Sequence, residues 1–166
     1  MLFRSVDRLA DNILPAAAEK GKLIPVLNKF RSYNSTEDVN YQTTRTVQDL
    51  SKSHLNRAMI QSDLERTAID VLEELDCIEC FTPNDARVGL VVPYEYNGEP
   101  KSYEPDFVVR LRGGKTIMLE IKGGKGKIHD PNRVTAKNAA AKKWCTAVSN
   151  INRYGDWEFK IWDDEN

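Results

Sequence analysis

Hydrophobic and polar residues alternate between Tyr103 and Lys122, and this alternation predicts a β-hairpin. Two short apolar runs, Phe107–Leu111 and Thr116–Ile121, flank an Arg-Gly-Gly connection, which is the pattern of two strands joined by a tight loop. Successive side chains of a strand point to opposite faces of the sheet, so each run presents an apolar face to bury. Glu120 and Lys122 share the opposite face of the second strand.

The length of the loop decides whether Asp106 meets Glu120. A two-residue turn of Gly113 and Gly114 would set Asp106 opposite Ile121, on the wrong side of the sheet. A three-residue loop, with a glycine in the left-handed conformation, sets Asp106 opposite Glu120. We predict the three-residue loop, so that two carboxylates and a lysine converge on one patch of one sheet face.

A helix is predicted over Ser62–Leu75, because apolar residues recur there along one helical stripe. Ser62 followed by Glu65 matches a capping box, in which the two side chains satisfy each other's backbone donors. The other predicted elements are strands over Cys77–Phe81 and Val88–Tyr96, a helix opened by Asp130-Pro131 and covering Val134–Ile151, and a strand over Trp157–Trp162. This order predicts an α/β fold with a mixed central sheet flanked by helices.

The first third of the chain gives weaker signals. Residues 3–14 place apolar side chains near helical spacing and predict a short amphipathic helix that ends at Pro15. Residues 31–50 are polar and lack a clear period. We therefore expect residues 1–52 to form an N-terminal helical or linker segment, and residues 53–166 to form one domain with a substantial core.

Composition points to a soluble globular protein, with 40% hydrophobic and 30% charged residues. No signal peptide and no apolar run of about 18 residues is present, so we expect a cytoplasmic protein that does not enter a membrane. Cys77 and Cys80 form a CxxC without a second pair, which is half of a zinc site. We expect buried or half-buried thiols at both positions.

Charge is distributed unevenly along the chain. Residues 110–143 contain ten basic and two acidic residues, so this window carries +8 and the remainder −9. Cations around an acidic pair are what a polyanion site needs, although a solvated charged surface is the alternative. The residues expected to bind nucleic acid are Lys125 and Lys127 in a glycine-rich loop, with Arg133 and Lys137 beyond it. This loop does not match a phosphate-binding GxxxxGK[ST] pattern.

Asp106 and Glu120 are the candidate ligands of a magnesium ion, helped by the backbone carbonyl of Ile121. Mg²⁺ is typically bound by one or two carboxylates while it keeps several waters, and it supports phosphodiester hydrolysis. Lys122 can hold the attacking water or a phosphate oxygen. The alternative is an ion-paired patch on an exposed sheet face.

The motif formed by Pro105-Asp106 and Glu120-Ile121-Lys122 resembles the PD-(D/E)xK nuclease superfamily. The chain is also similar, over most of its length, to the C-terminal endonuclease region of type III restriction enzyme nuclease/helicase subunits. The similar runs are Ser53–Asn56, Ser62–Glu65, Val92–Tyr96, Tyr103–Phe107, Leu119–Gly123, Lys137, Ala140-Ala141, Trp144, Ala147-Val148 and Gly155–Trp157.

This resemblance implies a restriction-endonuclease-like core with Asp106, Glu120 and Lys122 as catalytic residues. It also implies that Glu65 supports the metal site from its helix, and that Lys137 contacts a phosphate. The role of Glu65 competes with capping, because a glutamate folded back on Ser62 cannot also reach the metal.

The implied function is a Mg²⁺-dependent DNA endonuclease, with Mn²⁺ as a substitute, that forms the nuclease module of a type III restriction-like defence system. The chain has no Walker-type ATP site, so we expect a helicase or translocase region, or a specificity subunit, in trans or in a parent chain. Mainly phosphate contacts are expected, because no residue pattern recognisably reads bases. The alternatives are a silent DNA-binding or partner-docking module, and an RNA-directed nuclease.

Overall fold

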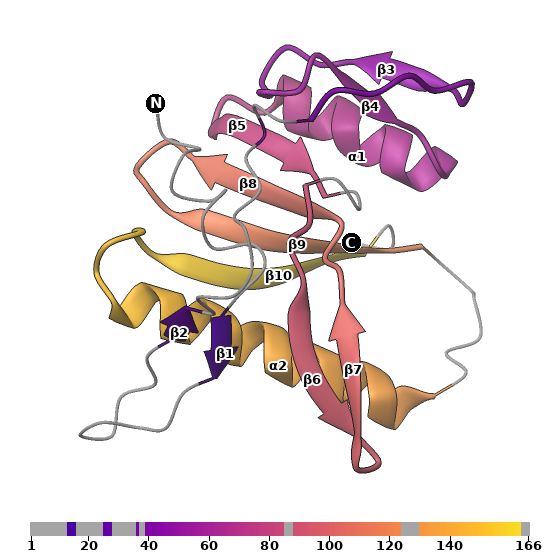
Figure 1. The fold of residues 1–166 in the computed structure, drawn as a ribbon. Coiled ribbons are helices and arrows are strands. Elements are labelled where there is room, and N and C mark those ends of the chain that lie inside the picture. The colour runs from indigo at the N-terminus through magenta and orange to yellow at the C-terminus, as the bar shows by residue number, and fades with distance from the viewer. Residues whose placement is uncertain are drawn as a thin grey trace.

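A computed structural model describes residue 36 and residues 39–84, 88–123 and 130–163, together with the backbone of residues 13–15 and 25–27. Figure 1 shows the arrangement of its helices and strands. These are, in chain order, β1 (Ile13–Pro15), β2 (Pro25–Leu27), β3 (Val47–Asp49), β4 (Arg57–Met59), α1 (Asp63–Glu74), β5 (Ile78–Pro83), β6 (Val92–Tyr96), β7 (Glu99–Tyr103), β8 (Phe107–Leu111), β9 (Thr116–Lys122), α2 (Pro131–Asn150) and β10 (Trp157–Asp163).

A four-stranded sheet in the order β10-β9-β8-β5 forms the centre of the fold. Strand β10 runs parallel to β9, whereas β8 is antiparallel to both of its neighbours. A parallel pair needs a crossover connection, which α2 supplies between β9 and β10. The predicted α/β fold with a mixed sheet is therefore confirmed.

Helix α2 covers the sheet face that carries Glu120. Val108 and Met118 on this face have no exposed surface (0%), and they pack with Trp144 and Val148 of α2 in one hydrophobic cluster. One alternative was an ion-paired patch on an exposed sheet face. The face is not exposed, because α2 covers it.

Helix α1 and the β3–β4 hairpin lie over the other face of the sheet (Figure 1). There Phe107 and Val109 of β8 pack with Ala68 and Ile69 of α1 in a second hydrophobic cluster. The predicted apolar face of the hairpin is therefore buried, as expected. The result is a sheet covered by a helix on each side.

The predicted beginnings of both helices are confirmed. Ser62 caps α1 by accepting a hydrogen bond from the backbone N–H of Glu65 at 3.1 Å. Asp130 caps α2 by accepting from the backbone N–H of Arg133 at 3.1 Å, and Pro131 follows in the first turn, where its missing N–H costs nothing.

Two hairpins were not expected from the sequence. Strand β7 pairs with β6 through a two-residue turn, in which Asn97 has φ 54° and Gly98 has φ 76°. Asn-Gly is the preferred dipeptide for such a turn. Strands β3 and β4 form the other hairpin.

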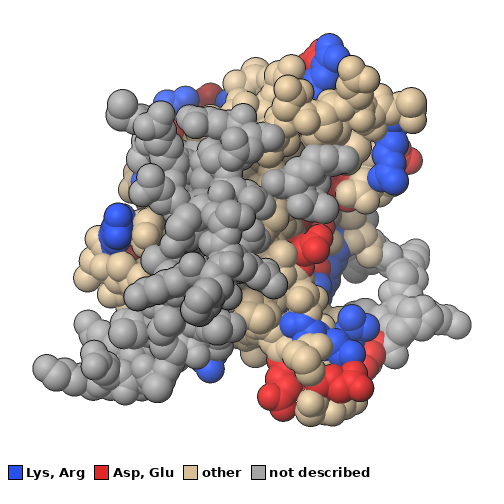
Figure 2. All heavy atoms as spheres, viewed as in Figure 1, with Lys and Arg blue, Asp and Glu red and all other residues tan. Residues whose placement is uncertain are grey.

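Figure 2 shows acidic and basic side chains gathered toward the free end of the β6–β7 hairpin, where Lys101 pairs with Glu99 at 2.5 Å.

Three further expectations are changed or limited by the structure. Ile13 and Leu14 belong to a strand, so the predicted helix does not extend over them, and residues 3–12 lie outside the described residues. Cys77 is exposed, whereas Cys80 is half-buried, so the expected burial is wrong for Cys77. Neither α1 nor α2 is long and apolar enough to cross a membrane within the described part of the chain.

Candidate acidic site

The β8–β9 hairpin has the predicted three-residue loop. Phe107 lies opposite Leu119, and the N–H of Leu111 donates to the carbonyl of Lys115 at 2.8 Å. Gly113 has φ 106° and Gly114 has φ 95°, values that side chains of L-residues rarely tolerate. Continued by one residue beyond the start of β8, this register sets Asp106 opposite Glu120, as predicted.

Asn84 fixes the backbone that carries Asp106. Its N–H donates to the carbonyl of Asp106 at 2.8 Å, and its side-chain amide donates to the carbonyl of Pro105 at 2.8 Å. The same amide group donates to the carbonyl of Leu90 and accepts from the N–H of Leu90, both at 2.9 Å. The local sequence around Asn84 does not predict these contacts, because the partners come from other segments of the chain.

Asp106 occupies an environment that disfavours its charge. Burial raises the pKa of its carboxyl to about 6, although the N–H of Ile121 donates to it at 2.6 Å and opposes the rise. The negative charges of Glu120 and Glu65 raise this pKa further, and the ammonium of Lys137 lowers it. A bound cation would relieve the same repulsion.

We expect this carboxyl to make the metal-free protein less stable as the pH rises from about 4 to about 6. The folded pKa of about 6 lies above the ordinary value of 3.8, so in this window the folded state binds more protons than the unfolded state. Other carboxyls titrate in the same range, and the comparison with Asp106→Asn isolates the effect. Urea unfolding in chelator at several pH values measures it. A constant difference in unfolding free energy between the two proteins would contradict the expectation.

Glu120 is the most completely buried acidic residue of the site, with 9% of its surface exposed. One carboxylate oxygen accepts from the hydroxyl of Tyr103 at 2.6 Å, and the other pairs with the ammonium of Lys137. The Lys137 nitrogen also lies 4.6 Å from the centroid of the Tyr103 ring. Burial raises the pKa of the Tyr103 hydroxyl, which keeps it protonated and able to donate. Sequence reasoning missed Tyr103, although it stands within the motif Tyr-Glu-Pro-Asp.

Glu65 makes a hydrogen bond at the start of α1 and also lies near Asp106, while its support of a metal site stays a prediction. Its carboxylate accepts from the backbone N–H of Gln61 at 2.9 Å, so it caps the helix through Gln61 instead of Ser62. It nevertheless lines a small cavity of about 50 Å³ together with Asp106. Capping and proximity to Asp106 are therefore compatible, because Gln61 lies on the side of the helix start that faces the acidic pair.

Lys122 ends β9, two residues beyond Glu120, and it is half-buried. Within the described residues it has no ion-pair partner within 4.0 Å, and Lys137 is the cation that contacts Glu120. The residue after Lys122 passes close to α1, because a Cβ added to Gly123 would lie 2.9 Å from a methyl of Leu64. The catalytic role of Lys122 stays a prediction.

The remaining basic residues are not part of this cluster as described. Lys125 and Lys127 lie outside the described residues. Arg133 is exposed and its guanidinium donates to the hydroxyl of Tyr94 at 3.2 Å, on the β6–β7 hairpin. Of the four residues expected to bind nucleic acid, Lys137 is the one that the structure brings to the acidic pair.

The predicted metal ligands are oxygen donors, the ligand type that a hard divalent cation such as Mg²⁺ prefers. Among the described residues no group of three or more His, Cys, Asp or Glu side chains is placed so that it could hold a metal ion. Asp106 and Glu120 supply two carboxylates, and the carbonyl of Ile121 is the third predicted donor. Mg²⁺ is commonly held by one or two carboxylates and waters. The ammonium of Lys137 already pairs with Glu120 and supplies one positive charge at the site.

Fold and site together define a mixed α/β domain in which a buried glutamate and a half-buried aspartate lie near a lysine. No protein-family model, curated protein or solved structure matches the chain. The resemblance to a nuclease family is therefore carried by the sequence motifs, and the function is argued from the geometry of the site.

Proposed function

We propose that the protein is a metal-dependent DNA endonuclease with a restriction-endonuclease-like core. The observation that carries the proposal is the register of β8 with β9, which sets Asp106 opposite Glu120. Two carboxylates at one end of a hairpin repel each other, and burial with neighbouring charges raises the pKa of Asp106 to about 6. A pair of this kind is unfavourable unless a cation is held there.

Asp106, Glu120 and the carbonyl of Ile121 would hold Mg²⁺, or Mn²⁺ in its place. The ion would neutralise charge on the scissile phosphate and lower the pKa of a bound water. Tyr103 orients the Glu120 carboxylate through its 2.6 Å hydrogen bond. Lys122 would hold a water or phosphate oxygen on the same sheet face, and Lys137 would exchange Glu120 for a substrate phosphate.

Cleavage of supercoiled plasmid tests the proposal directly. We expect nicked and linear products with Mg²⁺ or Mn²⁺, and no product after the metal is removed with EDTA, because the acidic pair alone cannot activate water at neutral pH. Restoration of cleavage by metal added back to the same sample is the control for irreversible damage. Cleavage that continues in EDTA would contradict a metal-dependent mechanism.

A silent DNA-binding module is the second candidate, and one observation favours it. The ammonium of Lys137 already pairs with Glu120, so the acidic pair is partly neutralised without a metal. This reading predicts DNA binding without nicking in any divalent metal. Isothermal calorimetry with Mn²⁺ in the absence of DNA separates the two, because a silent module has no need to bind the ion.

The wider assignment to a type III restriction-like defence system rests on the sequence resemblance. Because the chain carries no Walker-type motif, a helicase or translocase region, or a specificity subunit, would supply ATP-driven movement and sequence choice. We propose DNA as the substrate and the cytoplasm as the location on the same basis.

A further inference from the structure

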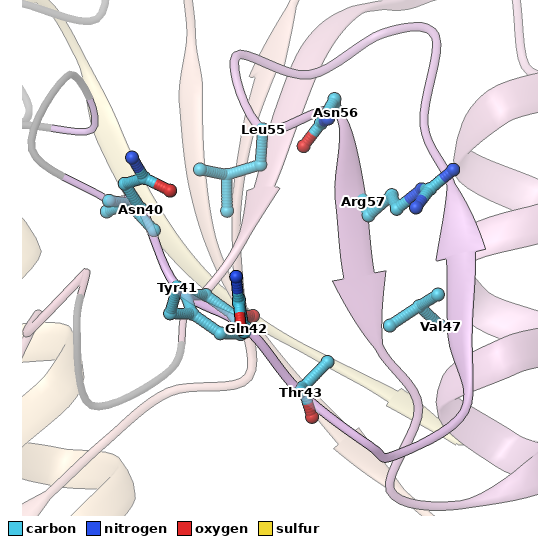
Figure 3. Close-up of a pocket in the computed structure, with 9 residues that line it drawn as sticks. Asn40, Tyr41, Gln42, Thr43, Val47, Leu55, Asn56 and Arg57 are labelled. Atoms are coloured by element: carbon cyan, nitrogen blue, oxygen red, sulfur yellow. The ribbon is translucent and has the colours of Figure 1, made fainter.

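A groove of about 490 Å³ lies beside the β3–β4 hairpin. Residues 39–43 form one wall and the hairpin forms the other, and Figure 3 shows the lining side chains around the space between them. Leu55, which is 8% exposed, and Val47 give the groove an apolar part. Ligand pockets commonly have volumes of about 300–1,000 Å³, so the groove is large enough for a small organic group.

The polar lining of the groove suits a nucleobase. Asn40, Gln42 and Asn56 contribute exposed amide side chains, and an amide can donate and accept at once, as base edges require. Tyr41 adds an aromatic ring, and single-stranded nucleic acids are bound by stacking on such rings. No carboxylate is present among the described residues that line the groove.

Arg57 adds a positive charge that could form an ion pair with a phosphate. Its guanidinium pairs with Asp49 at 2.7 Å, but the two side chains are 60% and 82% exposed. An ion pair this exposed contributes little to stability. Replacing Asp49 by a backbone phosphate as the partner of Arg57 therefore costs little free energy. A guanidinium also binds phosphate well.

The groove adjoins the small cavity at Asp106. The small cavity that Glu65 and Asp106 line shares Tyr41, Leu55 and Arg57 with the groove. A strand that lies in the groove would therefore have its next backbone groups beside Asp106. The shared lining residues favour a nucleotide as the occupant, since the groove and Asp106 would hold neighbouring parts of one polymer.

We propose that this groove binds one unpaired nucleotide of a DNA strand, immediately next to the bond at Asp106. The base would stack on Tyr41 and hydrogen-bond to Gln42 and Asn56, and the adjoining phosphate would meet Arg57. A base paired within a duplex cannot enter a groove of this kind, so the substrate is a tailed, gapped or locally opened DNA. The inference deepens the proposed endonuclease function and rests on it for the position of the cleaved bond.

Fluorescence anisotropy tests the groove without cleavage, with EDTA present and the full chain as the protein. The probes are a labelled blunt DNA duplex and the same duplex with a single-stranded tail. We expect the wild-type chain to bind the tailed probe about 10-fold more tightly, which is the size of effect that one base stacked on an aromatic side chain predicts. The Gln42→Ala/Asn56→Ala double variant, and separately Tyr41→Leu, should lose this ratio. Asn132→Ala removes an exposed amide on α2 and should retain it.

The groove and the endonuclease activity can fail independently of each other. Equal binding of both probes by the wild-type chain, or an unchanged ratio in the double variant with a normal melting temperature, would overturn the groove assignment. Tighter binding of an RNA tail than of a DNA tail would overturn the choice of DNA. If plasmid is cleaved but the ratio is absent, the groove fails and the endonuclease stands. If the ratio is present and depends on Gln42 and Asn56 but no metal supports cleavage, the groove stands and the endonuclease fails.

Discussion

Asp106→Asn is expected to reduce plasmid cleavage by about 100-fold or more while the fold is retained. Asparagine keeps the shape of the side chain, and its amide oxygen can still accept from the N–H of Ile121, as Asp106 does at 2.6 Å. It removes the negative charge that a divalent cation needs, and loss of one group that stabilises transition-state charge typically costs about 10²–10³ in rate. Stability near neutral pH should not fall, since the substitution removes a charge whose environment raises its pKa.

The rate of loss of supercoiled plasmid in Mg²⁺ measures this effect. Glu158→Gln is the matched control, because Glu158 is a surface carboxylate on β10 that pairs with Lys115 at 3.0 Å and Lys160 at 2.5 Å. The control should cleave at the wild-type rate. Equal rates for Asp106→Asn and a control that cleaves as the wild type does would rule out Asp106 as a metal ligand.

Lys137→Met is expected to destabilise the metal-free protein by about 3–5 kcal/mol, the usual cost of leaving a buried charge without its partner. The side chains of Lys137 and Glu120 are 21% and 11% exposed, so the abandoned carboxylate has little access to water. Only the Tyr103 hydroxyl would still contact it among the described residues. A divalent cation should replace the lost ammonium and restore part of the stability.

Thermal unfolding of wild-type and variant proteins, each with Mn²⁺ and with EDTA, measures both effects. The control is Lys160→Met, because Lys160 pairs with Glu158 on the surface and is 56% exposed. Exposed pairs contribute about 0–1 kcal/mol, so the control should melt close to the wild type and respond to Mn²⁺ as the wild type does. A Lys137→Met protein as stable as the control in EDTA would show that the buried pair does not hold the site together.

Local sequence predicted the hairpin because its determinants are close together in the chain. Alternation in the two strands and the three-residue loop with Gly113 and Gly114 leave one register that buries the apolar face. The opposition of Asp106 and Glu120 follows from that register alone. For the same reason the helix caps at Ser62 and Asp130 were predictable.

Contacts between distant segments were not predictable. Tyr103 and Lys137 both reach Glu120 from 17 residues away in the chain, from β7 and α2. The sequence around Tyr103 and around Lys137 shows no pattern that predicts a contact with Glu120. Strand β7 contains Pro100, which disfavours a strand. Among the described residues β7 pairs with β6 alone, and proline is tolerated where one edge of a strand needs no donor.

The hydrogen bonds of Asn84 couple the position of Asp106 to the packing of the hydrophobic cluster under α2. One side chain holds both the backbone before Asp106 and the backbone of Leu90, and Leu90 is 1% exposed in the cluster under α2. A repacking of that cluster around Leu90 is therefore expected to shift Asp106 through Asn84. Random mutagenesis that selects for loss of function should accordingly recover core substitutions around Leu90, in proteins that still fold and whose acidic residues are all intact.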